Sequence, residues 1–195
     1  MKGKTGRFLL GTSGYSYPHW SGGIFYPPGL PRNKWLEYYS THFNSVELNV
    51  TFYRLPVKQT FEGWYKRTPE NFTFVVKGSK YITHTKLLKD CEEPLARFFE
   101  HAERLREKLD VVLWQLRPKH AIDCNRLQNF FHLLTKYPGT NTVRHVFEFR
   151  HVTWFCKETY ELLKEYGFGL CLAHSDRWPL QEEVTAGFVY LRFHG

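Results

Sequence analysis

Residues 146–154 read VFEFRHVTW, and this stretch decides which fold the chain can adopt. Its apolar start, Val146-Phe147, predicts a buried β-strand. The strand ends in Glu148, Arg150 and His151, where turn residues would be expected. Charged groups at the edge of a core are costly unless they are paired or used. The fold therefore has to provide either partners or a ligand for these polar groups.

Strand-like runs rich in Val, Phe and Leu recur along the whole chain. They cover residues 7–13, 45–53, 72–77, 110–116, 143–150, 167–174 and 188–194. Most contain short, nearly continuous apolar stretches, which is typical of strands that are covered on both faces, as in a parallel sheet.

Helical patterns separate these runs, at residues 31–43, 58–67, 91–109, 124–137 and 153–166. Asp90 and Asp123 are predicted to cap two of these helices, Asp90 with Glu93 three residues later as in a capping box. Gly167 is expected to end the last one. Open doubly wound sheets and closed barrels both show this alternation of strands and helices.

We predict an α/β fold, a TIM-type (β/α) barrel with seven of its eight β/α units visible, as one domain over residues 1–195. A full barrel typically needs about 250 residues, and this chain has 195. The chain is therefore expected to be either a shortened barrel or a fragment that lacks the last strand and helices.

The overall charge of the chain favours anionic partners, either a small molecule or nucleic acid. The net charge is +8 and the pI is near 9.3. A basic surface without a specific partner explains the charge equally well, because the basic residues are scattered among acidic ones. The sequence does not define an oligomeric state.

Cysteine usage and hydropathy indicate a cytoplasmic protein without a membrane partner. No stretch reaches the roughly 18 apolar residues of a membrane span, and the apolar run Phe8–Leu10 is too short for a signal peptide. The cysteines are widely spaced without a C-x-x-C pair, so we expect packing roles rather than a zinc site or disulfides. They are Cys91, Cys124, Cys156 and Cys171.

Polar residues lie toward the carboxyl end of every predicted strand, which is where barrel enzymes place their active sites. Alternation puts every second residue of a strand on the same face. The predicted catalytic residues are Glu47, Glu148, His174 and His194. The predicted substrate- or anion-binding residues are Tyr15, Asn49, Tyr53, Lys77, His84, Gln115, Arg150, Trp154 and Arg192. Further side chains expected at the same mouth are Tyr17, Trp20, Asp176 and Trp178.

These polar groups have two explanations. They form a functional cleft, or they form structural ion pairs that close the top of the barrel, for example Glu148 with Arg150 or Arg192. We favour the cleft, because every strand contributes to it.

Six stretches of the chain resemble the YecE-like proteins, the domain of unknown function 72. They are GTSGYSYPHWSGGIFYP (11–27), FNSVELNVTFYRLP (43–56), FTFVVKGSKYITH (72–84), VLWQL (112–116), EFRHVTW (148–154) and YLRFHG (190–195). The resemblance implies a (β/α) barrel and no particular activity. Arg117 departs from the family pattern, which has proline after Gln-Leu. Family members also continue past the HG of the seventh predicted strand.

The chemistry of the predicted mouth supports two main hypotheses. The first is a hydrolase or lyase for a phosphate-bearing or nucleic-acid-like substrate, with Lys77, Arg150 and Arg192 binding the anion. Glu148 or Glu47 would act as general base or metal ligand, and His194 or His174 as general acid. A divalent metal stays open, although no H-x-x-E-H spacing supports one.

The second hypothesis is a non-catalytic module that binds nucleic acid or a nucleotide, which the positive charge and the stacking aromatics favour. A third is a barrel that has lost its activity.

Overall fold

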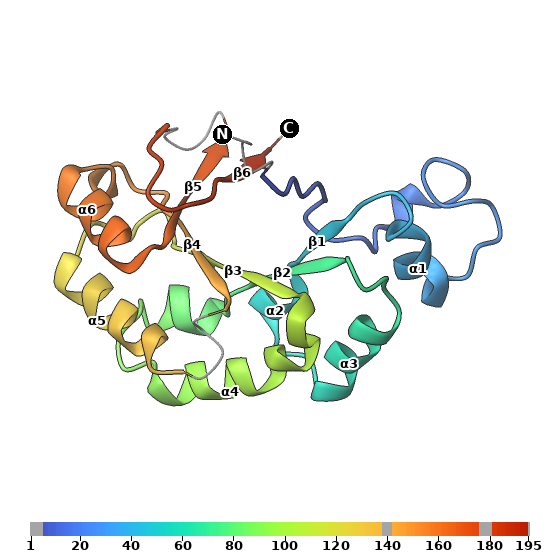
Figure 1. The fold of residues 1–195 in the computed structure, drawn as a ribbon, viewed down its shortest axis with the longest axis horizontal. Coiled ribbons are helices and arrows are strands. Elements are labelled where there is room, and N and C mark those ends of the chain that lie inside the picture. Colours follow the sequence, from blue (N-terminus) through green and yellow to red (C-terminus); the bar gives the residue numbers. More distant parts are fainter. Residues whose placement is uncertain (1–5, 138–141, 176–180, 195) are drawn as a thin grey trace, which may run out of the picture.

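The computed structural model describes residues 6–137, 142–175 and 181–194. Six strands form one parallel sheet, and their order in the sheet is their order in the chain. The sheet curls into an open half-barrel with helices on its convex side (Figure 1). The strands are β1 (Ser45–Leu48), β2 (Thr73–Lys77), β3 (Leu109–Gln115), β4 (Arg144–Glu148), β5 (Gly169–His174) and β6 (Tyr190–Phe193).

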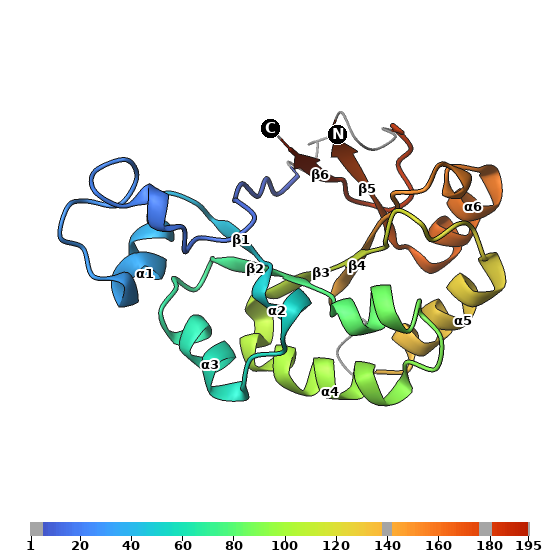
Figure 2. The ribbon, with the colours of Figure 1, turned by 180° about the vertical axis from the view of Figure 1, so that it is seen from behind.

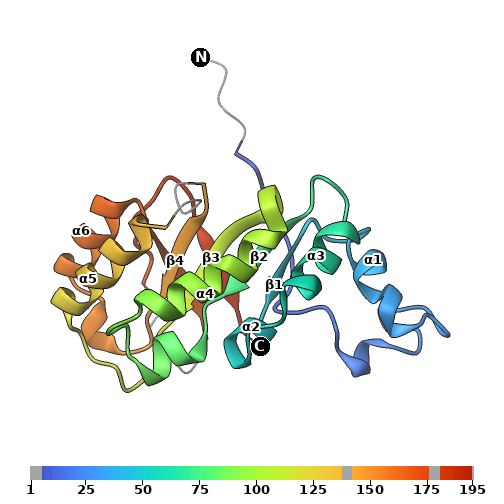
Figure 3. The same ribbon diagram turned by 90° about the horizontal axis from the view of Figure 1, so that it is seen from below.

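In the described part of the chain, six α-helices connect or flank these strands. They are α1 (Trp35–Tyr39), α2 (Val50–Tyr53), α3 (Lys58–Lys66), α4 (Glu92–Ala102), α5 (Cys124–Thr135) and α6 (Lys157–Tyr166). Figures 2 and 3 show that α3 to α6 line the outside of the curved sheet. In the described part of the chain, no helix has the length and apolar character that a membrane crossing requires.

The sheet separates two apolar layers because successive strand residues point to opposite faces. The larger layer lies between the sheet and the helices, where Trp114 and Phe147 of the strands meet Phe98 and Phe130 of the helices. Each buried phenylalanine contributes about 1.5–3 kcal/mol to folding. The smaller layer lies on the concave face and consists of Val75, Val111, Leu113, Val146, Cys171 and Ala173.

The predicted strand at residues 7–13 is wrong, so the described residues form six strands instead of seven. The Asn44 side chain holds this segment, accepting from Leu10 N at 2.8 Å and donating to Phe8 O at 3.0 Å. One backbone hydrogen bond joins the segment to β1, from Glu47 N to Thr12 O. The segment therefore runs beside β1 without forming a ladder. The strand predicted at residues 45–53 is also shorter, because α2 begins at Val50.

The predicted helix ends are partly confirmed. The Asp123 carboxylate caps α5 by accepting from Arg126 N at 3.0 Å, and Gly167 ends α6 in the left-handed conformation at φ 66°. The predicted cap at Asp90 is wrong: α4 begins after Cys91, without a side-chain cap. Asp90 itself has φ 50°, so the chain enters α4 through a left-handed turn that moves this carboxylate out of the capping position.

Candidate functional site

Polar side chains from five strands meet at the carboxyl end of the concave face, above the inner apolar layer. Gln115 and Glu148 are direct neighbours in the register of β3 and β4. Lys77 ends β2, Glu47 lies on β1, and Arg192 lies on β6 at the far edge of the sheet. All five side chains are buried. We call them the polar cluster: Glu47, Lys77, Gln115, Glu148 and Arg192.

Arg192 occupies the centre of the polar cluster. Its guanidinium donates from Nη1 to Glu148 Oε2 at 2.5 Å and from Nη2 to Glu47 Oε1 at 2.9 Å. The planar fork of an arginine suits two carboxylates on different strands, which the point charge of a lysine would not match. Burial raises the cost of each isolated charge, so one cation between two anions keeps the cluster stable.

Glu148 is fully buried and has every acceptor position occupied. Gln115 Nε2 donates to both carboxylate oxygens at 2.9 Å, and Arg150 Nε donates to Oε1 at 2.8 Å. Burial alone would raise the pKa of Glu148, but Arg192 and Arg150 outweigh it and hold the pKa below its ordinary value. Glu148 is therefore an ionised hydrogen-bond acceptor whose main contacts are within the protein.

Two residues outside the predicted set complete the shell of Glu47. Tyr190 donates its hydroxyl to Glu47 Oε2 at 2.7 Å, and Ser13 donates to Oε1 at 3.2 Å. Burial, followed by the charge of Glu47, raises the pKa of Tyr190 well above its ordinary value, so it stays a donor. The sequence held a signal for Tyr190, which stands two residues before Arg192 and therefore on the same face.

Lys77 differs from the other charged members of the polar cluster because it has no carboxylate partner among the described residues. It is only 8% exposed, and none of the described residues forms an ion pair or hydrogen bond with its Nζ. The Nζ lies 4.4 Å from the centre of the Phe52 ring. Burial, followed by the nearby Arg192, lowers the pKa of Lys77 to about 8, although Glu47 and Glu148 act in the opposite direction.

His84 follows β2 in a short π-helical turn, Tyr81–Thr85, and is surrounded by positive charge. Burial lowers its pKa first. The four strongest electrostatic contributions then all come from cations, and together they lower the pKa to about 4. We call these the cation group: Lys77, Lys80, Arg117 and Arg150. The imidazole is therefore neutral at pH 7 and lies in a positive potential.

Two further predicted residues lie beside the polar cluster, each with an unsatisfied polar atom. Asn49 donates from Nδ2 to Ser13 O at 3.1 Å, while its buried Oδ1 has no hydrogen-bond partner among the described residues. His194 likewise has a buried Nε2 to which no residue in the described ranges forms a hydrogen bond. Burial and then Arg192 lower the pKa of His194, which keeps its imidazole neutral at pH 7.

The structure does not bring the other predicted residues to the polar cluster. Trp154 is fully buried, stacks on Phe149 and donates to His120 O at 2.6 Å, so its indole has no face for a ligand. The Tyr15 hydroxyl accepts from Trp64 Nε1 at 3.0 Å. Tyr53 is 77% exposed on α2.

His174 is exposed at the end of β5 with its ring near Phe193. Tyr17 lies closer to the polar cluster, because its hydroxyl donates to Ser13 O, and Trp20 packs against the Tyr17 ring. Asp176 and Trp178 lie outside the described residues.

The two buried carboxylates do not fit a metal site. Within the described ranges, no three side chains of His, Cys, Asp or Glu gather as a metal ion would require. Glu47 and Glu148 already share the guanidinium of Arg192 as their common cation.

A cavity of about 450 Å³ lies at the opposite end of the sheet, below the first residues of β1 and β2. In barrel enzymes this end contributes to stability, and the chemistry takes place at the carboxyl end. We therefore place the candidate site at the polar cluster and not in this cavity. The cavity is lined by Arg7, Asn44, Glu70, Asn71, Phe72, Thr73 and Glu107.

Two curated relatives are similar to this chain over much of its length. UPF0759 protein YunF of Bacillus subtilis (strain 168) is 32% identical over 146 residues, which are 70% of this chain and 49% of that protein. UPF0759 protein YecE of Escherichia coli (strain K12) is 30% identical over 122 residues, which are 63% and 43%. The chain spans about half the length of the curated relatives it matches.

Solved structures with the same fold come from the same family. The crystal structure of the DUF72 family protein TM1631 from Thermotoga maritima MSB8 matches with a TM-score of 0.80 and 31% identity, covering 96% of this chain and 74% of that one. The DUF72 family protein EF0366 from Enterococcus faecalis V583 matches with a TM-score of 0.76 at 24% identity, covering 96% and 70%, and supports the fold alone. The family model "Protein of unknown function DUF72" matches residues 9–195. The chain therefore belongs to the DUF72 family, as the resemblance of its sequence to the YecE-like proteins indicated.

Proposed function

We propose that this protein is an enzyme, a hydrolase or a lyase, that acts on a phosphate-bearing or nucleic-acid-like substrate at the carboxyl end of the half-barrel. The observation that carries the proposal is the excess of positive charge around His84. Lys77 lacks a carboxylate partner among the described residues, and Arg117 has a buried Nε without one. Guanidinium and ammonium groups in this arrangement match the oxygens of a phosphate.

The proposal includes the architecture that positions the site. We propose that residues 1–195 form a single domain, a TIM-type (β/α) barrel in which seven of the eight positions are taken by this chain. The segment before β1 supports this count, because Thr12 O accepts from Glu47 N and the segment thus takes the first position without strand geometry. Active sites of such barrels lie at the carboxyl ends of the strands, where the polar cluster is found.

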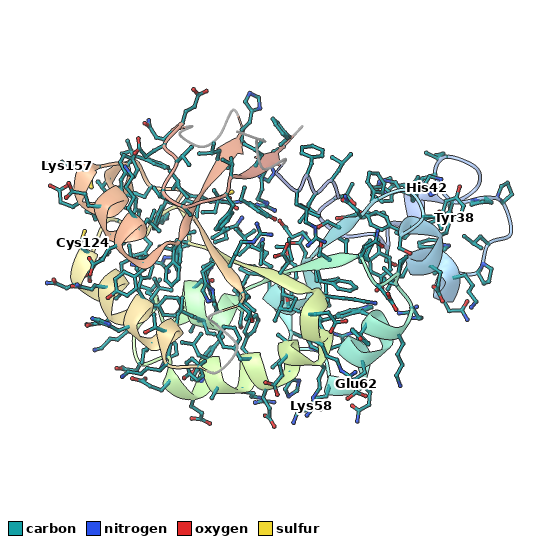
Figure 4. All side chains as sticks on the ribbon, viewed as in Figure 1. Tyr38, His42, Lys58, Glu62, Cys124 and Lys157 are labelled. Atoms are coloured by element: carbon teal, nitrogen blue, oxygen red, sulfur yellow. The ribbon has the colours of Figure 1, made fainter. Side chains whose placement is uncertain are left out.

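The anion site is tested by titrating the protein with a 5′-phosphorylated single-stranded oligonucleotide at several salt concentrations. We expect the affinity to fall steeply as salt rises, because phosphate contacts release counterions. Exchanging Lys80 and Arg117 together for Gln should weaken binding at least about tenfold, which corresponds to about 1.4 kcal/mol. The matched control is Lys157→Gln, because Lys157 projects from α6 on the outer side of the molecule (Figure 4). Equal affinities for the wild type and the double variant would refute the anion site.

A non-catalytic binding module is the second candidate, favoured by the state of the two carboxylates. Glu148 and Glu47 each accept hydrogen bonds from three side chains. Their oxygens are therefore occupied by protein donors, which disfavours a role as general base for a substrate proton. Turnover separates the two functions. Chromatography of phosphorylated substrates, with and without Mg²⁺, Mn²⁺ or Zn²⁺, should reveal a product if the protein is an enzyme. Binding without any product would favour the module.

A further inference from the structure

Lys77 has the surroundings of a nucleophilic lysine. It ends β2 at the carboxyl edge of the sheet, it is 8% exposed, and it has no carboxylate partner among the described residues. Its Nζ rests over the apolar ring of Phe52, with the cationic Arg192 close by. Apolar surroundings and a neighbouring cation are the two conditions that turn a lysine amine into a nucleophile.

We propose that Lys77 forms a Schiff base with the aldehyde of a phosphorylated sugar, whose phosphate binds to Lys80, Arg117 and Arg150. This inference rests on the proposed anion site, because it uses the cation group around His84 to hold the phosphate end of the substrate. It adds a covalent step and a substrate class to that site. Imine chemistry suits a lyase, since a protonated imine withdraws electrons from the adjacent carbon.

Binding the phosphate and forming the imine require different side chains. Lys80 and Arg117 provide cations that stay outside the covalent step, and Arg150, which is paired with Glu148, adds to the positive potential around His84. Lys77 is then available for the carbonyl carbon. Its lowered pKa of about 8 supports this division, because roughly a tenth of the amine is neutral at pH 7.

The step balances without a cofactor. The neutral Nζ of Lys77 adds to the aldehyde carbon, and one proton moves from nitrogen to the former carbonyl oxygen to give a carbinolamine. The hydroxyl then takes a proton from solvent and leaves as water, while the nitrogen lone pair forms the C=N bond. The products are a protonated imine and one water molecule, and no electron is transferred.

Borohydride trapping tests the inference on the full chain. The protein is incubated with 2-deoxyribose 5-phosphate, and sodium borohydride then reduces any imine to a stable secondary amine. We expect one adduct per chain by intact mass, and peptide mapping of the wild type should place it on Lys77. Unphosphorylated 2-deoxyribose should give at least tenfold less adduct at the same concentration, because it lacks the group that the cations hold.

Two variants sharpen the result. Lys77→Arg keeps the positive charge but cannot form an imine, so the adduct should disappear. Lys157→Arg removes an exposed lysine of α6 and should leave the yield unchanged. An adduct distributed over surface lysines, or one that persists in Lys77→Arg, would overturn the inference.

The binding of inorganic phosphate separates a failure of the Lys77 imine from a failure of the proposed anion site. Phosphate that binds to the wild type without any trapping at Lys77 refutes the imine and leaves the anion site intact. If neither phosphate binding nor trapping occurs, both proposals fail. Peptide mapping of the wild type needs no variant, so a folding defect in Lys77→Arg would not obscure the answer.

Discussion

At the scale of single residues, the candidate site consists of an inner part that is electrostatically satisfied and an outer part that is not. Arg192 bridges Glu47 and Glu148, Arg150 also pairs with Glu148, and the donors Gln115 and Tyr190 complete the hydrogen bonds of the two carboxylates. Lys77, Lys80 and Arg117 form no ion pair with a carboxylate among the described residues, whereas Arg150 pairs with Glu148. The inner part therefore positions the side chains of the site, and an incoming anion would find its most favourable electrostatic interaction in the outer part.

Replacing Arg192 by Met should strongly destabilise the protein. The change leaves two buried carboxylates without their shared cation, and breaking a buried ion pair in this way costs about 3–5 kcal/mol. Urea denaturation followed by circular dichroism measures the free energy of unfolding. Lys157→Met is the control, because its ion pair with Glu161 is exposed and contributes at most about 1 kcal/mol. A loss below about 1 kcal/mol in Arg192→Met would contradict the central role of this guanidinium.

The affinity for sulfate should depend on pH through Lys77. An ordinary lysine stays protonated to above pH 10, but the pKa of Lys77 is lowered to about 8. The ammonium is therefore charged below pH 8 and neutral above it, so sulfate binding should weaken as the pH rises from 7 to 9. Sulfate keeps its charge over this range. The charged groups that act on Lys77 are Arg192, Glu47, Glu148 and Arg150.

Isothermal titration calorimetry at several pH values measures this dependence. Lys77→Met should bind sulfate more weakly at pH 7 and should show a flat profile across the same range. A wild-type affinity that is constant from pH 7 to 9 would mean that Lys77 does not contact the anion.

At the scale of elements, the strands and helices that follow from hydrophobic periodicity were predicted correctly. The errors lie where one local contact or turn determines the backbone conformation. Six strands were predictable because alternation and apolar content mark a covered parallel sheet. Residues 7–13 have the same apolar character, but the Asn44 side chain takes their backbone groups in place of a ladder. The helix cap at Asp123 was predicted and is present. The cap predicted at Asp90 is absent, because this residue adopts a left-handed conformation where the chain enters α4.

The candidate site was predictable to the extent that it follows from strand alternation. Glu47, Glu148 and Arg192 share the concave face as expected, and alternation also placed Tyr190 beside them. The direction of side chains outside the strands was not predictable. Trp154 was expected at the mouth, yet its indole turns into the core to stack on Phe149. Hydrophobic periodicity does not predict the direction of a side chain outside a strand, because that direction depends on how the neighbouring elements pack.

Gly78, directly after β2, should not tolerate a side chain. A Cβ at this position would overlap the Trp114 indole, which packs against the backbone there. Gly78→Ala should therefore lower the free energy of unfolding by about 1–3 kcal/mol, the usual cost of overpacking. Gly63→Ala is a matched control within α3, where a Cβ meets nothing within 4 Å. That change should stabilise by about 0.5–1 kcal/mol, since alanine favours a helix. Thermal and urea unfolding of both variants measure these effects. A change in the free energy of unfolding with the same sign in both variants would contradict the packing argument.

At the scale of the whole molecule, the described strands leave the sheet open between β1 and β6. The two edges face each other across the concave side (Figures 1 and 2). Side chains join them: Arg192 and Tyr190 of β6 both donate to Glu47 of β1, and Arg192 also reaches Ser13 at 3.4 Å. The hydrogen bonds that build the polar cluster are thus also the bonds that hold the curl of the sheet.

This double role predicts how a small change spreads through the molecule. Tyr190→Phe removes one donor to Glu47 with little change in shape, so the link between β6 and β1 should weaken while the centre of the sheet stays intact. Hydrogen–deuterium exchange measured by mass spectrometry should show faster exchange in β6 and in the segment around Ser13, which are distant in sequence. Exchange in β3 should stay unchanged, because β3 is paired on both sides. Tyr166→Phe is the control, since the contacts described for its hydroxyl are with His132 and Gln128 of α5, neither of which belongs to β6 or β1. Faster exchange confined to β6 would mean that the two edges are independent, whereas coupled exchange would show that closing the sheet and assembling the polar cluster are one event.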